Sequence, residues 1–237
     1  MKTITIWSDF ACPYCYIGER RLKDAIHELG VEKEIRIDYR AFELDPNAPI
    51  HPKGETVERM AAKYGISTEQ ARKQVENIDR LGRELGIDFK FSGAKSSNTF
   101  DAHLLMKFAE AAYEPAIVEA LNEALFDAYF VKNEVLADRK VLLRIVESVG
   151  MDPVQAKEVL DQNLYANQVR YDEQEAAARG VHGVPYMVFD GEFAVPGAIS
   201  TDDCKIALRD MLSRVKEKPD NLHPTACDET GCRVEKK

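Results

Sequence analysis

The chain reads Trp7-Ser8-Asp9-Phe10-Ala11-Cys12-Pro13-Tyr14-Cys15 near its amino end. Before this stretch, residues 2–7 alternate between apolar and polar side chains, which predicts a short strand. After it, apolar residues recur at helical spacing from 22 to 29, and Gly30 is expected to end that helix. Residues 35–42 alternate again and predict a second strand. The chain therefore opens with strand, Cys-x-x-Cys, helix and strand, which is a βαβ unit.

The middle of the chain has helical periodicity and little strand character. Helices are expected around 57–64 and 71–85, and over 98–112, 115–130, 138–149, 153–163 and 165–179. Strand character returns at Tyr186-Met187-Val188-Phe189, and Asp190-Gly191 is a strong hairpin signal. Ser200 then caps a last predicted helix, with Asp203 three residues later.

This order of elements predicts an α/β protein of thioredoxin-like fold with a large all-helical insertion. The thioredoxin-like domain is expected to be discontinuous, formed by residues 1–42 and 180–217. Residues 43–179 are expected to form the helical insertion domain. Residues 218–237 are expected to form a C-terminal tail that carries Cys227 and Cys232 with four residues between them.

The first cysteine pair is a candidate redox centre. Cys12 is expected at the start of a helix, where free amide groups and the helix dipole stabilise an anion. The thiolate is the nucleophile in disulfide exchange, and Cys15 is close enough to attack a mixed disulfide at Cys12. Pro13 suits the first helical turn. Two other interpretations are a pair of buried, inert cysteines and half of a zinc site.

Gly183-Val184-Pro185 stands directly before a predicted strand. Proline is uncomfortable inside a central strand but suits a cis peptide bond in a tight loop. Such a loop would expose the Val184 backbone to an extended substrate beside Cys12. The alternative is an ordinary loop proline.

Composition narrows the classes of function and location. The 237-residue chain is 45% hydrophobic and has a net charge of −9, so nucleic acid and anionic membranes are not expected as partners. No stretch approaches the length of a membrane span or a signal peptide, which predicts a cytoplasmic protein. Thiols stay mostly reduced in the cytoplasm, where structural disulfides are rare. Paired cysteines in such a protein are therefore expected to have a redox or metal-binding role.

These residues resemble the DsbA branch of the thioredoxin superfamily, and most of all FrnE-type proteins, relatives of 2-hydroxychromene-2-carboxylate isomerases. The resemblance extends over about residues 3–215 and includes Ser96-Ser97-Asn98-Thr99-Phe100-Asp101-Ala102-His103. It implies thiol–disulfide oxidoreductase or isomerase activity, with Cys12 as nucleophile, Cys15 as resolving cysteine and Pro185 as cis-proline. Tyr14 stands where the strong oxidase has histidine, so a milder potential is expected.

The resemblance also suggests roles for residues outside the first cysteine pair. The candidates for the substrate cleft are Pro13, Tyr14, Val184, Asn98 and His103. For Asn98 the alternative role is a helix cap, and for His103 it is a histidine packed in the core. Cys227 and Cys232 are expected to relay electrons to or from the first pair, with a metal clip or surface thiols as alternatives. Cys204 falls on the apolar face of the last predicted helix and is interpreted as a core cysteine.

Three functions compete at this point. The first is a thiol–disulfide oxidoreductase acting on protein or small-molecule thiols and disulfides, recycled by a reductase or oxidase. The second is a glutathione-dependent isomerase or transferase for an aromatic small molecule. The third is a binding protein in which the four cysteines hold structural zinc. Under the first hypothesis we expect no bound metal and no cofactor beyond the redox-active disulfide, with glutathione as a candidate co-substrate.

Overall fold

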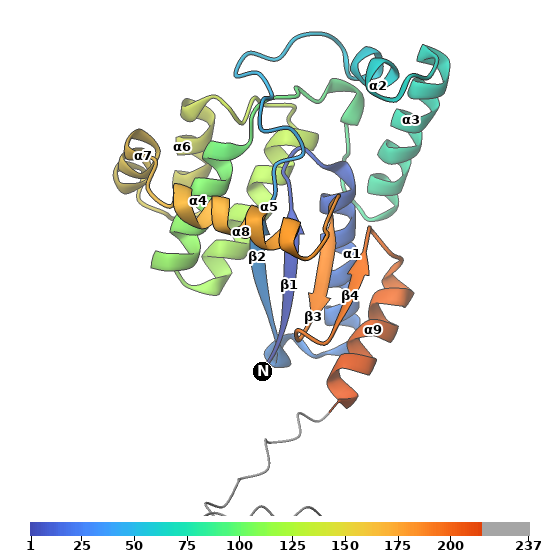
Figure 1. Ribbon diagram of the computed structural model, residues 1–237, viewed down its shortest axis with the longest axis vertical. Helices are drawn as coiled ribbons and strands as arrows, with labels where there is room; N and C mark the ends of the chain where they lie inside the picture. The colour runs from blue at the N-terminus through green and yellow to red at the C-terminus, as the bar shows by residue number, and fades with distance from the viewer. Residues whose placement is uncertain (215–237) are drawn as a thin grey trace, which may run out of the picture.

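A computed structural model describes residues 1–214 of the chain. Its single four-stranded sheet has the order β2-β1-β3-β4 (Figure 1). The strands are β1 (Lys2–Ser8), β2 (Ile35–Ala41), β3 (Tyr186–Phe189) and β4 (Phe193–Pro196). β1 runs parallel to β2, whereas β3 is antiparallel to both β1 and β4. The sheet is therefore mixed, with β2 and β4 at its two edges.

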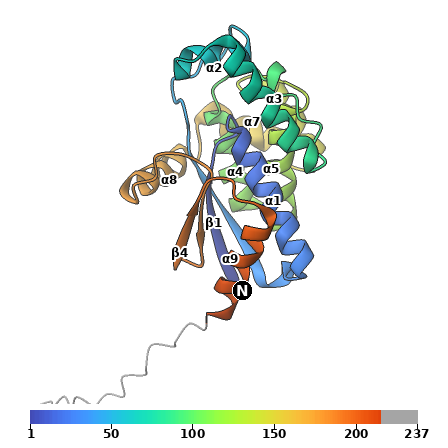
Figure 2. The same cartoon turned by 90° about the vertical axis from the view of Figure 1, so that its right-hand side faces the viewer.

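Nine α-helices lie within the described residues. They are α1 (Pro13–Leu29), α2 (Thr56–Tyr64), α3 (Thr68–Glu84), α4 (Phe100–Ala112), α5 (Pro115–Phe130), α6 (Arg139–Ser148), α7 (Pro153–Gln162), α8 (Ala166–Ala178) and α9 (Thr201–Ser213). α1 and α9 cover one face of the sheet, and α8 lies on the other face (Figure 2). All the helices from α2 to α8 come between β2 and β3 in the chain. The predicted α/β thioredoxin-like fold with a large helical insertion is confirmed, whereas the predicted domain boundaries stay a prediction.

Local chemistry explains where several helices begin and end. Gly30 ends α1 in the left-handed conformation, with φ of 66°, which costs glycine no steric strain. Asp138 and Asp152 accept hydrogen bonds from backbone amides at the starts of α6 and α7, and Ser200 does the same for α9. These four predicted helix boundaries are confirmed because each depends on one local hydrogen bond or one dihedral angle.

Two of the three apolar clusters among the described residues lie on either side of the Cys-x-x-Cys motif. The smaller one packs Ile4 and Ile6 of β1 against α1 and α9 and includes Cys204, which is fully buried as predicted. The larger one contains the inserted helices together with Phe10, Cys12, Cys15, Tyr16 and Ile17. Stacking of Tyr16 on Phe126, with ring centroids 5.0 Å apart, links α1 directly to α5. The motif is therefore held between the sheet and the insertion.

No helix within residues 1–214 combines the length and the apolar character that crossing a bilayer requires.

Candidate functional site

Cys12 and Cys15 lie where β1 gives way to α1. Cys12 is the N-cap residue, in an extended conformation with φ of −97° and ψ of 111°, and Pro13 follows at the first helical position. The Cys12 amide donates to the Asp9 carbonyl at 3.0 Å, and the Cys15 amide donates to the Cys12 carbonyl at 3.1 Å. The two cysteines lie close together as free thiols. The strand end and the first helical turn therefore fix both sulfur atoms.

The loop before β3 completes the surroundings of Cys12. The Val184–Pro185 peptide bond is cis, as predicted, and the Cys12 thiol donates to the Val184 carbonyl at 3.4 Å. Gly18 of α1 allows this loop to approach, because a Cβ atom there would lie 3.2 Å from Pro185 Cγ. The chain thus brings Val184 and Pro185 to Cys12 from 172 residues away in sequence.

The two thiols differ in their surroundings. Cys12 is 4% exposed and Cys15 is 0% exposed. Burial raises the pKa of Cys15 well above its ordinary value, and the hydrogen bond and charge of Cys12 raise it further. The Asp9 amide and the Ser8 hydroxyl act in the opposite direction, because both can donate to a Cys15 thiolate. Cys15 is therefore a protonated thiol at neutral pH unless a neighbouring group takes its proton.

Glu19 lies one helical turn beyond Cys15 and is itself buried. Its Oε1 accepts from the Ser8 hydroxyl at 2.8 Å, and its Oε2 accepts from Asn122 Nδ2 at 2.5 Å. Burial raises the pKa of Glu19, with Lys23 partly opposing the effect. Ser8 thus connects the Cys15 thiol to a buried carboxyl group whose affinity for protons is increased.

Asp9 anchors the motif to the insertion. Its buried carboxylate accepts from the Ala11 amide at 3.0 Å, from the Thr99 hydroxyl at 2.8 Å and from the Leu44 amide at 2.7 Å. These donors belong to the motif loop, the start of α4 and the segment after β2. One carboxylate therefore ties together three segments that meet at the cysteines.

The other predicted site residues occupy different positions. Tyr14 is 43% exposed, and burial, Cys12 and Tyr64 raise its pKa. His103 is buried beneath the motif, with its ring 5.1 Å from Phe10 and its Nε2 3.7 Å from Asp9 Oδ1.

The Asn98 side chain caps the start of α4 and ties it to the segment that follows β2. It accepts from the Phe100 amide and donates to Pro46 and Glu43. Substrate binding by Asn98 and His103 stays a prediction.

The second cysteine pair, Cys227 and Cys232, lies outside the described residues. Within residues 1–214, no three or more histidine, cysteine, aspartate or glutamate side chains are grouped so that they could hold a metal ion.

Sequence reasoning missed Ser8, Asp9, Glu19 and Asn122. A signal existed for Glu19, since four residues after Cys15 is one turn along the same helix face. Ser8 and Asp9 directly precede the motif and could have been singled out as polar residues at a strand end. Asn122 had no signal, because only tertiary packing brings α5 to α1.

Comparisons with known proteins agree with this geometry. A probable DsbA oxidoreductase of Streptomyces coelicolor, SCO1869, has a crystal structure that superposes with a TM-score of 0.86 at 30% identity, covering 100% of both chains. A 2-hydroxychromene-2-carboxylate isomerase superposes with a TM-score of 0.63 at 16% identity, over 88% of this chain and 94% of the isomerase. YwbO, an uncharacterized protein of Bacillus subtilis strain 168, is 24% identical over 87% of this chain and 96% of its own length. Residues 3–209 match the family described as the DSBA-like thioredoxin domain, and the chain belongs to that family.

Proposed function

We propose that this protein is a thiol–disulfide oxidoreductase in which Cys12 is the nucleophile and Cys15 the resolving cysteine. The observation that carries the proposal is the position of Cys12, at the N-cap of α1 and hydrogen-bonded to the carbonyl before a cis-proline. Family membership supports the same chemistry. We place the activity in the cytoplasm, on protein or small-molecule thiols and disulfides, with a reductase or oxidase restoring the starting state.

In the reductive direction, the Cys12 thiolate attacks one sulfur of a substrate disulfide. A mixed disulfide forms at Cys12, and the other substrate sulfur leaves as a thiolate that takes up a proton. Once Cys12 no longer donates to it, the Val184 carbonyl can accept a hydrogen bond from an extended substrate. The oxidative direction is the same sequence in reverse.

Cys15 then attacks the Cys12 sulfur, which releases the second substrate thiol and leaves a Cys12–Cys15 disulfide. Two electrons pass from the protein dithiol to the substrate, and two protons leave the cysteines for the two product thiols. The proton of the buried Cys15 passes to the Ser8 hydroxyl while Ser8 donates its own to Glu19. Glu19 suits this task because its raised pKa brings its proton affinity closer to that of a thiol.

The test is a redox titration in glutathione buffers, read by thiol trapping and mass spectrometry. We expect a reversible Cys12–Cys15 disulfide at a potential of about −270 to −180 mV, the range from thioredoxin to disulfide isomerase and milder than DsbA at about −120 mV. Cys12→Ser should abolish exchange, whereas Cys15→Ser should accumulate the mixed disulfide. Cys204→Ser is the matched control, because Cys204 is buried in the other core. A cysteine pair that stays reduced throughout the titration would refute the proposed function.

A further inference from the structure

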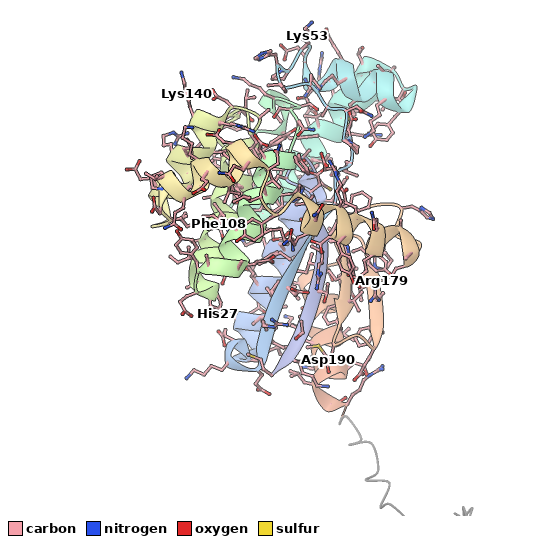
Figure 3. The ribbon with its side chains drawn as sticks, turned by 60° about the vertical axis from the view of Figure 1, so that its left-hand side comes forward. His27, Lys53, Phe108, Lys140, Arg179 and Asp190 are labelled. Carbon is pink, nitrogen blue, oxygen red and sulfur yellow. The ribbon has the colours of Figure 1, made fainter. Side chains whose placement is uncertain are left out.

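α1 and α5 pack against each other in opposite directions beyond the cysteine motif. Tyr16, directly after the motif, stacks on Phe126. One turn further along α1, Glu19 Oε2 accepts from Asn122 Nδ2 at 2.5 Å, one turn back along α5. Figure 3 views the molecule from the side where α1 and the helices of the insertion lie next to each other, with His27 labelled in the last turn of α1. The buried carboxyl group therefore lies inside this helix pair.

Lys23 occupies the next turn of α1. It follows Glu19 by four residues, so the two side chains leave the same face of the helix, with their Cβ atoms about 5–6 Å apart. Lys23 Nζ lies 3.2 Å from Glu119 Oε1 and 3.6 Å from Glu123 Oε2, and the lysine side chain is only 18% exposed. Both carboxylates belong to α5. The helix pair thus holds a half-buried ammonium group one turn away from a buried carboxyl group.

The positive charge of Lys23 acts on Glu19 against the effect of burial. Burial raises the pKa of Glu19, and the Lys23 ammonium group is the strongest of the effects that lower it. The hydrogen bonds from Ser8 and Asn122 lower this pKa less, and the charge of Glu123 raises it by the smallest amount. Lys23 is therefore the main group that favours the ionised form of this carboxyl group.

Titratable side chains of β2 and α4 also face this region. A small cavity touches both hydrogen-bond partners of the buried carboxyl group, and its lining includes Ser8, Asn122, Tyr39, His103 and Lys107. Burial and then the charge of Glu19 raise the pKa of Tyr39 well above its ordinary value, so Tyr39 is a neutral hydroxyl at pH 7. Lys107 is bound by Glu110 and Asp172. The main charges that act on Glu19 remain those of its own helix and of α5.

We propose that Lys23 is a positioning residue for the resolving step: its ammonium group keeps the Glu19 carboxyl group ionised at neutral pH, so that Glu19 can take the proton of Cys15. The inference rests on the proposed function, in which that proton passes through Ser8. Lys23 itself neither gives up nor takes up a proton, and the bonds that form and break are those of the proposed exchange. Without this charge, a larger fraction of the molecules would already hold a proton on Glu19 and could not accept another.

The experiment follows the decay of a mixed disulfide on Cys12 across pH in the full-length protein. Lys23→Met removes the charge and keeps an unbranched side chain. We expect the pH of half-maximal rate to rise by about one unit, with the maximal rate at high pH unchanged. Lys23→Arg should keep the wild-type midpoint, because arginine keeps the positive charge. A purely structural role of Lys23 would instead lower the rate at every pH.

Lys205→Met is the matched control. Lys205 is 21% exposed and pairs with two carboxylates, Glu28 near the end of α1 and Asp202 of α9. It therefore resembles Lys23 in exposure and in number of partners, but its contact with α1 lies more than two turns beyond Glu19. Its replacement should leave the pH of half-maximal rate unchanged.

Two further measurements decide whether the effect passes through Glu19. In a Glu19→Gln background, Lys23→Met should not change the pH dependence, because no carboxyl group remains to titrate. A carbon NMR titration of the Glu19 carboxyl group should show the same upward shift in Lys23→Met as the rate does. This titration does not depend on thiol exchange, so it separates the role of Lys23 from the proposed function.

The inference is overturned by an unshifted Glu19 titration, by a shift in rate that persists in the Glu19→Gln background, or by an equal loss of rate at every pH. Each of these results leaves a reversible Cys12–Cys15 disulfide, and with it the proposed function, intact. A cysteine pair that never oxidises while the Glu19 titration still shifts would refute the proposed function instead.

Discussion

At the scale of single residues, the two motif cysteines have only two residues between them, but their environments differ greatly. Cys12 caps a helix and contacts a loop carbonyl, whereas Cys15 is completely enclosed. A thiol that burial keeps protonated needs a proton acceptor inside the protein. Glu19, reached through Ser8, is the carboxyl group in that position.

Glu19→Gln should slow resolution of the mixed disulfide by about 100-fold, because it removes the acceptor but keeps a similar shape. In wild type, the rate of resolution should fall as pH drops through the raised pKa of Glu19, and the variant should lack this dependence. Stopped-flow decay of a mixed disulfide on Cys12, followed across pH, measures both. Glu123→Gln is the control, since Glu123 is a more exposed carboxylate that pairs with Arg20 and Lys23.

The stability of the same variant separates proton transfer from a structural role. Since the folded-state pKa of Glu19 is raised, its stabilising effect is complete below the ordinary value of 4.5 and is lost as pH rises through the folded value. Glu19→Gln should therefore be at least as stable as wild type at pH 7, as measured by urea unfolding. A variant that loses rate and stability together would instead point to a packing role.

At the scale of elements, α1 organises the site along three of its surfaces. Its first turn holds the cysteines, one face presents Glu19 to α5 through Asn122, and another face meets the Pro185 loop at Gly18. A Cβ atom at Gly18 would lie 3.2 Å from Pro185 and 3.3 Å from Ala198. The absence of a side chain there lets the loop reach Cys12.

Gly18→Val should reduce the rate of thiol exchange, because the new side chain displaces the loop that carries the Val184 carbonyl. Helix propensity alone favours valine over glycine, so it cannot account for a loss. Gly82→Ala is the control: its Cβ would lie 2.6 Å from Phe89 and not against the Pro185 loop, and it should cost about 1–3 kcal/mol of stability without slowing exchange. Denaturant unfolding measures the stability of both variants, and thiol-exchange kinetics measures their activity. An exchange rate in Gly18→Val equal to that of wild type would exclude a role of Gly18 in placing the loop.

The elements themselves were largely predictable, and the contacts between them were not. Apolar spacing and caps such as Asp138 and Asp152 are local, so the sequence predicts those helices closely. The cysteine pair is also a local motif. Asn122 meets Glu19 across 103 residues, and Lys107 meets Tyr39 across 68. Neither apolar periodicity nor a local sequence motif predicts these long-range hydrogen bonds, because they form only when helices of the insertion pack against the βαβ unit.

At the scale of the whole molecule, the insertion and the Cys-x-x-Cys motif share one core. Tyr16 stacks on Phe126, and Asp9 bonds both Thr99 and the Leu44 amide. Groups from the sheet side and from the insertion therefore complete each other's packing and hydrogen bonding. Without the insertion, Asp9 would lose the Thr99 and Leu44 donors and keep only the Ala11 amide.

Unfolding should consequently be a single cooperative transition. Trp7, the only tryptophan, is buried in the sheet and donates through Nε1 to the Asp172 carbonyl of α8 at 2.9 Å, so its fluorescence reports on the contact between the sheet and the insertion. Circular dichroism at 222 nm reports mainly on the helices, most of which belong to the insertion. The two signals should give the same denaturant midpoint and slope. Loss of the helical signal at a lower denaturant concentration than the Trp7 signal would show that helices of the insertion unfold before the contact between α8 and the sheet is lost.

The predicted electron relay through Cys227 and Cys232 can also be tested at the scale of the whole molecule. The Arg214 carbonyl accepts from Lys2 Nζ at 3.0 Å, so the described chain ends beside the start of β1. Cys227 follows thirteen residues later, and such a length spans up to about 45 Å. The seven residues of β1 span about 23 Å, so Cys227 is within reach of Cys12.

If Cys227 and Cys232 exchange electrons with the first pair, Cys15→Ser treated with a mild thiol oxidant should form a disulfide from Cys12 to one of them within the same chain. Peptide mapping by mass spectrometry identifies the bond. Cys204 should stay reduced, because it is 0% exposed and burial raises its pKa to about 11. A product in which Cys227 pairs only with Cys232, while Cys12 remains a free thiol, would argue against the relay, since the oxidised second pair would then have failed to engage the nucleophile that it is expected to serve.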